Sequence, residues 1–400
     1  MLGIRNLNKC DMFLALNVLY SMQGLLYPSG VINRILQLVI IVWGLIIFSK
    51  YTFGPLRQTR LLKATSALVF MYCLYGGLLI IIGNPLLTAS IPGLPAKYIY
   101  LQVSLRSLLR IYVFYYYASV GYLTATRIRF YAVILLLSLI PQYYYQKAQI
   151  TFTLGRDEVT NNIGYPFLSI ITVLFFFNKK PFLQYVLLAA TLIYIIMSMK
   201  RGAIAIGLVS VVALIGANIF SSSNKYKFWS VLFTAVLITG VTVFVSFMMS
   251  ESDLFVYRIE QTLSGDSSAR DVLYETTWRR ITEESNIFYI LFGRGADSTF
   301  AVAGDYAHQD WLETLCNNGL VGGVILLCFY VSLFRDACSS KNVFSRNYYI
   351  AYMLLFFNVF AATMFSMSIQ SMELSYSMLL GYFTYWKGRP RREIVLEGLA

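Results

Sequence analysis

The sequence predicts an all-α membrane protein with about twelve transmembrane helices and one long external loop. Of its 400 residues, 58% are hydrophobic and only 13% are charged, and the mean hydropathy is +0.63. A water-soluble domain of this length could not keep so much apolar surface away from water. Aromatic residues make up 16% of the chain. Many Tyr and Trp lie at the ends of apolar runs, where their amphipathic rings suit the headgroup layer.

Apolar runs that approach the roughly 20 residues needed to cross a bilayer as a helix follow one another along the chain. The predicted spans are 11–28, 31–49, 66–84, 98–122, 130–146, 163–177, 181–198, 202–220, 228–249, 309–333, 348–366 and 373–386. The long loop is the segment 250–307. We expect no cleavable signal peptide, because the first run is followed directly by others. Without an internal repeat, a low-complexity tract or a soluble linker, residues 1–400 are predicted to form a single integral membrane domain.

Positive charge is distributed unevenly over the loops, and this sets the predicted orientation. Of the 32 Lys and Arg residues, nineteen lie in one set of alternating segments that includes both termini, whereas the other short loops hold five and the long loop holds five. Lys and Arg mark the cytoplasmic side of the bacterial inner membrane. Both termini are therefore predicted to be cytoplasmic and the long loop external. Because topology explains most of the net charge of +13, no nucleic-acid partner is expected.

The five cysteines agree with this orientation. Cys10 and Cys338 fall in predicted cytoplasmic segments, and the other three fall in predicted spans. No external disulfide is therefore expected.

Arg106 and Arg110 lie inside the fourth predicted span, four residues apart and so on one face of the helix. A charge inside the bilayer costs at least a few kcal/mol, which makes such residues functional candidates. One interpretation is a structural ion pair with a carboxylate at a similar depth. The candidate carboxylates are Asp310, Glu313 and Glu373. The other interpretation is an open cationic site for an anionic ligand such as a lipid phosphate.

Two more arginines stand at predicted membrane boundaries. Arg201 opens the eighth span in the string Met199-Lys200-Arg201-Gly202-Ala203, which places its guanidinium at the external surface. It is either a helix-end charge that extends to the headgroups or a ligand-binding group. Arg34, near the external start of the second span, has a weaker functional claim.

The long loop is predicted to contain a short helix along the membrane surface, with Ser267 or Ser268 as its N-cap. Asp271 lies in the first turn, and apolar residues form a partial face. These are Val272, Trp278 and Ile281. Arg270 lies in the first turn as well, where the helix dipole disfavours a cation. Either an anionic partner explains its placement or it is an ordinary solvated loop residue.

His308 is the only histidine, and it lies where the long loop enters the tenth span. Its unperturbed pKa of about 6.5 suits proton transfer near neutral pH. From His308 the chain reads HQDWLETLCNNGLVGG, which gives His-Gln, nine residues, Gly319, two residues, then Gly322 and Gly323. The glycines are expected to let another helix approach closely.

This string resembles the last external-loop signature of the O-antigen ligase and polymerase family, which is His followed by Asn, Ser or Gln, nine residues and Gly-x-x-Gly. Lys200-Arg201-Gly202-Ala203 resembles the family's Ser-Arg-Gly-Ala, with Lys in place of Ser. The run from Ser267 through Arg270 and Trp278 to Gly293-Arg294-Gly295 is similar to the family's S-x-x-R, W, P-x-x-G-x-G loop, without the proline. The resemblance is specific over about 195–330 and rests on topology elsewhere.

The resemblance implies a GT-C-like, metal-independent and cofactor-free inverting glycosyltransferase of the inner membrane, whose active site faces outward. Its donor would be a polyprenyl (undecaprenyl) diphosphate-linked glycan in contact with membrane lipid, and a flippase and a chain-length regulator would be partners. His308 inherits the role of general base. Arg201 and Arg270, joined by Arg106 or Arg110, inherit the binding of the diphosphate. Glu313, five residues beyond His308, would orient the acceptor sugar or hold Arg106 or Arg110.

Three activities remain open at this point. A polymerase would extend lipid-linked repeat units into O-antigen or capsular polysaccharide, and a ligase would pass the glycan to lipid A core or another terminal acceptor. A flippase or transporter would also suit twelve spans with intramembrane arginines. The single long loop, the lack of a repeat and the His308 motif favour the enzyme, and the divergence outside short motifs favours the polymerase.

Overall fold

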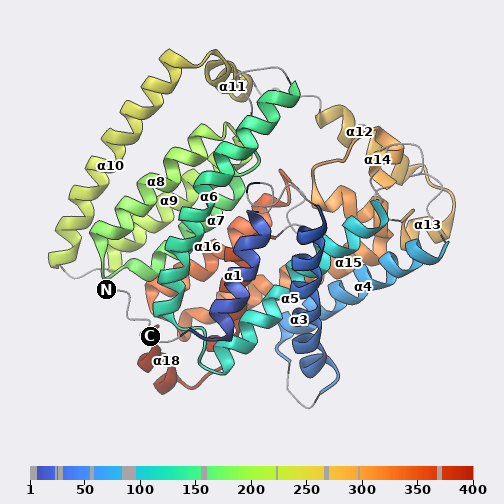
Figure 1. The fold of residues 1–400 in the computed structure, drawn as a ribbon, viewed down its shortest axis with the longest axis horizontal. Helices are drawn as coiled ribbons and strands as arrows, with labels where there is room; N and C mark the ends of the chain where they lie inside the picture. The colour runs from blue at the N-terminus through green and yellow to red at the C-terminus, as the bar shows by residue number, and fades with distance from the viewer. Residues whose placement is uncertain are drawn as a thin grey trace.

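The computed structural model describes residues 7–22, 25, 30–54, 58–82, 96–154, 160–221, 224–264, 270–295, 298–366 and 372–399. Within these ranges the chain is helical and contains no strand, as the sequence predicts (Figure 1). The predicted N-cap of the long-loop helix, Ser267 or Ser268, lies outside the described residues.

Helices occupy all twelve predicted apolar runs. In chain order the α-helices are α1 (Lys9–Ser21), α3 (Gly30–Thr52), α4 (Arg60–Ile82), α5 (Ala96–Ser119), α6 (Ala125–Leu154), α7 (Gly164–Val173), α8 (Pro181–Met197), α9 (Arg201–Ser221), α10 (Asn224–Glu251), α11 (Asp253–Leu263), α12 (Arg270–Thr282), α13 (Ile287–Phe292), α14 (Ser298–Ala303), α15 (Asp310–Ser339), α16 (Arg346–Ala362), α17 (Leu374–Lys387) and α18 (Arg391–Glu397). Two 3₁₀ turns extend α7 and α15, namely η1 (Leu174–Phe177) and η2 (Ser340–Asn342).

Five of these helices are long and apolar enough to cross a membrane by length and composition. The corresponding stretches are Gly30–Thr52, Ala125–Phe152, Arg201–Phe220, Lys227–Glu251 and Asp310–Asn342. Among them, α10 is the least buried, and it stands at the outer edge of the molecule (Figure 1). Its Val236, Val243 and Phe247 are more than half exposed. An apolar helix with so little protein around it needs an apolar solvent, which the lipid of a membrane supplies.

Local signals explain where several helices begin. At the start of α1, the Asn8 side chain accepts hydrogen bonds from the amides of Cys10 and Asp11, and the Asp11 carboxylate accepts one from the Asn8 amide. This reciprocal capping satisfies amides that have no partner within the helix. Pro181 is the first residue of α8, a position where its missing N–H costs nothing.

The packing centres on α5, which contacts α3, α4 and α17, while α7, α8, α9 and α16 form a second group. Tyr112 and Phe114 of α5 are fully buried. The packing of α17 on α5 is unusually close, because a Cβ added to Gly381 would lie 2.6 Å from the Tyr115 amide nitrogen and 2.7 Å from the Ile111 carbonyl oxygen. This approach fixes the position of the first residues of α17, which reach the candidate site.

The loops gather at two ends of the helical assembly, in the alternation that the charge pattern predicts. At one end the Asn8 side chain donates to the Tyr122 carbonyl, and the Ser345 amide donates to the Leu399 carbonyl. At the other end the Asn161 amide donates to the Ser198 carbonyl, and α11 to α14 lie along this side, far from α18 (Figure 1). That the α18 end faces the cytoplasm stays a prediction from the distribution of Lys and Arg.

Candidate active site

A cavity of about 270 Å³ lies at the end of the assembly opposite α18. Its polar lining comes from six segments of the chain: the start of α7, the α8–α9 turn, the start of α12, the loop before α15, the turn after α16 and the start of α17. The titratable side chains that line it are Tyr165, Lys200, Arg270, His308, Glu373 and Tyr376. The structure therefore brings together two of the predicted site residues, His308 and Arg270.

His308 enters this cavity from a strained backbone. Its φ is +51°, in the left-handed region that residues other than glycine seldom adopt. The neighbouring backbone holds it there, because the Ala307 amide donates to the Glu313 carboxylate at 2.6 Å and the Asp310 amide donates to the Thr363 carbonyl at 3.0 Å. Non-glycine residues held in this region are concentrated at functional sites, where the surroundings fix a side chain in one direction.

Burial lowers the pKa of His308 below its usual value, and the nearby cations Arg270 and Lys200 lower it further, while Asp305 opposes them. A lowered pKa means that the imidazole is predominantly neutral at pH 7. A neutral imidazole has a free lone pair. His308 can therefore accept a proton from a hydroxyl group placed in the cavity.

Glu313 has a different position from the one that the sequence predicts. Its side chain is 1% exposed and does not line the cavity. Its carboxylate accepts hydrogen bonds from the Ala307 amide, the Thr299 hydroxyl and the Asn317 side chain at 3.4 Å. Glu313 thus stabilises the loop that carries His308 and has no route to a sugar in the cavity.

The glycines of the His308 motif were expected to let another helix approach closely. In the structure their close contacts are with the 291–295 segment and with α15 itself. At Gly319 the helix α15 is kinked, with φ of +63°, and an added Cβ would lie 2.5 Å from the Gly293 nitrogen. Cβ atoms added to Gly322 and Gly323 would meet side chains of the preceding turns of α15 itself. The close partner is therefore the 291–295 loop, whose Arg294 and Gly295 amides donate to the carbonyls of residues 316 and 317 at 3.0 Å.

Lys200 lines the cavity, and Met199 directly before it is the other non-glycine residue with positive φ, +53°, in the described part of the chain. A Cβ on Gly202 would lie 2.5 Å from the Tyr165 hydroxyl oxygen, so the small residue lets α9 start against α7. Burial lowers the pKa of Lys200 to about 8, helped by the charges of Arg270, Arg258 and Arg201. Lys200 therefore lies within electrostatic reach of three arginines.

Arg270 is the first described residue of α12, and its side chain donates to the Phe365 carbonyl at 3.4 Å. It interacts electrostatically with His308, Lys200 and Tyr165. Val272 and Trp278 on the same helix are more than half exposed, in keeping with a helix along the membrane surface. The structure therefore places Arg270 in the lining of the cavity, and its binding of an anionic ligand stays a prediction.

Arg201 does not line this cavity. It lies at the start of an apolar groove of about 540 Å³ between α8, α9, α10 and α11, together with Arg258 of α11. The remaining lining is almost entirely aliphatic, and it follows α9 from Arg201 to Ile215, a rise of roughly 21 Å. Lys200 lines the cavity, and the next residue, Arg201, lines the groove.

Arg106 and Arg110 lie behind the cavity wall. The Arg110 Nε donates to the Asn17 side chain at 2.6 Å, and the Arg106 guanidinium lies 4.3 Å from the centre of the Tyr20 ring. Neither lines the cavity, but both interact electrostatically with Glu373, which does. Of the three predicted carboxylates, Glu373 is the one the structure brings to the arginine pair. Arg34, on α3, is exposed.

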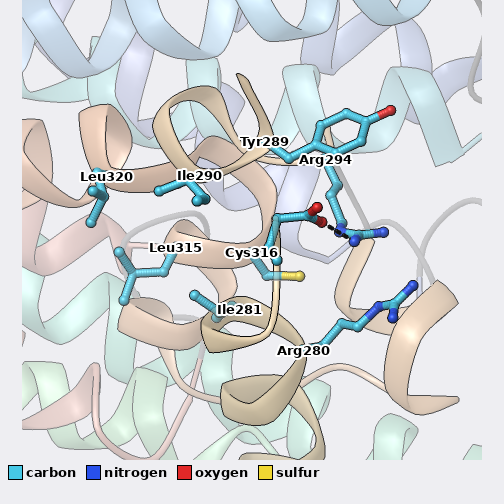
Figure 2. A pocket seen from close by; sticks show the side chains of 9 residues that line it. Arg280, Ile281, Tyr289, Ile290, Arg294, Leu315, Cys316 and Leu320 are labelled. Atoms are coloured by element: carbon cyan, nitrogen blue, oxygen red, sulfur yellow. Dashed lines mark hydrogen bonds and ion pairs between the residues drawn. The ribbon is translucent and has the colours of Figure 1, made fainter. Parts of the chain in front are cut away.

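A second, smaller cavity of about 50 Å³ lies beside the 291–295 loop (Figure 2). Arg294 forms an ion pair with Glu284 there, and its guanidinium carbon lies 5.3 Å from the centre of the Tyr289 ring. Figure 2 shows the side chains of Arg294 and Tyr289 next to each other at this cavity. Cys316, which belongs to a predicted span, is a buried free thiol in the lining of this cavity. Arg294 is thus occupied by a structural ion pair, away from the cavity of His308.

No protein-family model matches the chain, and no curated protein matches its sequence. Among the described residues, no three His, Cys, Asp or Glu side chains gather closely enough to hold a metal ion. Sequence reasoning missed Lys200 and Tyr165 as site residues and treated Glu373 only as an ion-pair partner. The signal for Lys200 was present, because it replaces the serine of the resembled Ser-Arg-Gly-Ala string.

Proposed function

We propose that the protein is a GT-C-like membrane glycosyltransferase that moves a glycan from a polyprenyl diphosphate carrier to the hydroxyl group of an acceptor sugar. The observation that carries this proposal is the cavity shared by His308, Lys200 and Arg270, together with an apolar groove whose lining includes the next residue, Arg201. A neutral base, fixed cations and an adjoining apolar channel are the features that a donor with a lipid tail, a diphosphate and a sugar requires.

The groove supports the orientation of the donor. Its aliphatic walls suit a polyprenyl tail, and Arg201 and Arg258 lie at the end where Lys200 begins the cavity. A diphosphate at this junction would meet Arg201 and Arg258 from one side and Lys200 and Arg270 from the other. Guanidinium groups bind phosphate oxygens in a fork geometry, and the ammonium adds a point charge.

The reaction follows from these positions. The acceptor hydroxyl attacks the anomeric carbon of the donor, and its proton passes to the neutral imidazole of His308. A bond forms between the acceptor oxygen and the anomeric carbon, while the bond from that carbon to the diphosphate oxygen breaks. The electron pair leaves with the diphosphate, whose charge Lys200 and Arg270 neutralise. Attack opposite the leaving group inverts the configuration at the anomeric carbon.

The setting in which this chemistry would take place is the bacterial inner membrane, with twelve spans, cytoplasmic termini and the cavity facing outward. We favour a polymerase that joins lipid-linked repeat units of O-antigen or capsular polysaccharide, assisted by a flippase and a chain-length regulator. A ligase would use the same donor with lipid A core as its acceptor. A flippase would need no base, so His308 separates it from both enzymes.

The test uses the full-length protein in lipid vesicles with a polyprenyl diphosphate-linked repeat unit as the substrate. The expected product is a ladder of longer lipid-linked chains. His308→Ala should reduce the rate by about 100-fold or more while the donor still binds. Lys341→Ala, an exposed change at the opposite end, should leave the rate unchanged. Full activity of His308→Ala would rule out the mechanism, and product formed only with lipid A core would identify the ligase.

A further inference from the structure

Among the described residues that line the cavity, Glu373 is the one acidic side chain. Lys200 and Arg270 come from the α8–α9 turn and α12, whereas Glu373 comes from the residue before α17. Binding of the donor diphosphate explains the two cations, because their positive charge attracts the phosphate oxygens. It does not explain the Glu373 carboxylate, whose negative charge would repel the diphosphate.

The packing of α17 on α5 holds Glu373 in place. The Ser377 hydroxyl donates to the Ser107 carbonyl at 3.2 Å, and Gly381 contacts the backbone of residues 111–115. Later residues of α17 meet later residues of α5, so the two helices run in the same direction. This register sets Glu373 beside the turns of α5 that carry Arg106 and Arg110.

The two arginines are held from the far side by α1. Arg110 donates to Asn17, which is itself buried, and Arg106 lies over the Tyr20 ring. Among the described residues, the buried Arg106 Nε and Nη1 atoms have no hydrogen-bond partner. The positive charges of these two guanidinium groups offset part of the cost of burying the Glu373 carboxylate. In the described part of the chain they form no ion pair with it within 4.0 Å, so its carboxylate oxygens are not used up by the arginines.

We propose that Glu373, supported by Arg106 and Arg110, forms the subsite for the acceptor sugar and accepts hydrogen bonds from its hydroxyl groups. This rests on the proposed function. A carboxylate is an acceptor with two oxygens, and it suits a pair of neighbouring hydroxyls. The attacking hydroxyl then faces His308, and the donor diphosphate stays at Lys200 and Arg270. Glu373 takes no proton in the reaction, because the proton goes to His308.

The chemical class of the acceptor follows from the hydrogen bonds that a carboxylate can accept. A neutral sugar with two neighbouring hydroxyl groups can donate one hydrogen bond to each carboxylate oxygen of Glu373. The subsite therefore suits an acceptor whose terminal sugar presents free neighbouring hydroxyl groups.

The test compares Glu373→Gln with the wild type and with Glu283→Gln, which removes an exposed carboxylate at the end of α12. The probe is the repeat-unit oligosaccharide of the host strain, freed from its lipid by mild acid, and its affinity is measured by calorimetry. Glu373→Gln should weaken binding by about tenfold or more, because an amide cannot replace both charged acceptor oxygens. Glu283→Gln should bind as the wild type does.

Kinetics with the lipid-linked substrate give the second readout. Glu373→Gln should raise the KM for the acceptor while the KM for the donor stays within about twofold. Arg110→Gln should also raise the KM for the acceptor. Thermal unfolding of each variant shows whether it is folded. Equal oligosaccharide affinity in folded Glu373→Gln and wild type would overturn the subsite. If the wild type binds the oligosaccharide through Glu373 but makes no product, the proposed function fails and the subsite stands.

Discussion

Lys200 and Arg201 are consecutive residues that line different hollows, Lys200 the cavity of His308 and Arg201 the apolar groove. The change of direction occurs at Met199, whose φ is positive, and at the start of α9, where Gly202 packs against Tyr165 and Phe365. In the proposed function, a turn of this kind would place one cation at the reacting end of the donor and the next beside its lipid tail. The roles of Lys200 and Arg201 can therefore be tested by separate substitutions.

Lys200→Met should lower kcat/KM for the donor by about 10-fold to 100-fold, since it removes a charged contact to the diphosphate. Lys200→Arg, which keeps the charge, should retain most of the activity. Initial rates in vesicles over a range of donor concentrations check this. Equal rates for Lys200→Met and the wild type would remove Lys200 from the diphosphate site.

The pH profile should report both titrating groups. Activity should rise with pH as His308 loses its proton, with a midpoint below the usual value near 6.5, because burial and the neighbours Arg270 and Lys200 lower its pKa against the effect of Asp305. Activity should fall again as Lys200 loses its charge at a pKa of about 8. In Lys200→Arg the alkaline limb should move upward, because arginine keeps its proton there. A profile with an unchanged alkaline limb in that variant would contradict the assignment.

Arg201→Ala and Arg258→Ala should each raise the KM for a long-chain polyprenyl donor by about tenfold, because both line the end of the groove. Leu208→Gln places a polar group in the aliphatic stretch of the groove. It should weaken the binding of long-chain donors more than the binding of analogues with a short tail. Measuring KM for both tail lengths separates the two effects. Equal sensitivity to Leu208→Gln for long and short tails would show that the tail lies elsewhere.

The sequence predicts the helices well, because apolar runs of membrane length carry a strong signal, and all twelve predicted runs are helical in the structure. It also singles out His308 and Arg270, because each stands in a short motif. It cannot show that Glu373 reaches the cavity and Glu313 does not. Glu313 follows His308 by five residues, whereas Glu373 is brought there by the packing of α17 on α5 around Gly381. Such contacts depend on tertiary packing, which spacing along the chain does not reveal.

Orientation in the membrane can be checked by labelling of single cysteines in a cysteine-free protein. Glu283→Cys on the predicted external side should react with a membrane-impermeant maleimide in intact cells. Lys341→Cys should react only after the membrane is permeabilised, since it lies with the positively charged segments. Both positions are exposed in the structure, so access is governed by the membrane alone. The reverse pattern would place the cavity on the cytoplasmic side.

Gly319→Ala should lower the unfolding temperature by several degrees, because φ is +63° and the new Cβ would lie 2.5 Å from the backbone of Gly293 and Leu291. Gly240→Ala on α10 is the matched control, since nothing lies within 4 Å of its added Cβ and alanine favours a helix. Thermal unfolding in detergent compares the two. If Gly319→Ala were as stable as the control, the close contact between α15 and the 291–295 loop would be wrong.

His308→Gly should change the activity of the protein without lowering its folding stability. Glycine adopts the observed φ of +51° without the steric cost that a side chain brings, which is of the order of 1 kcal/mol. The folded state should therefore be as stable as the wild type or slightly more stable, although glycine also adds freedom to the unfolded chain. Glycosyl transfer should still be lost, because no proton acceptor remains. Added imidazole, which can diffuse into the vacated space, should restore part of the rate, with the pH dependence of free imidazole replacing that of His308. If His308→Gly kept full activity without imidazole, the base would have to be sought elsewhere in the cavity.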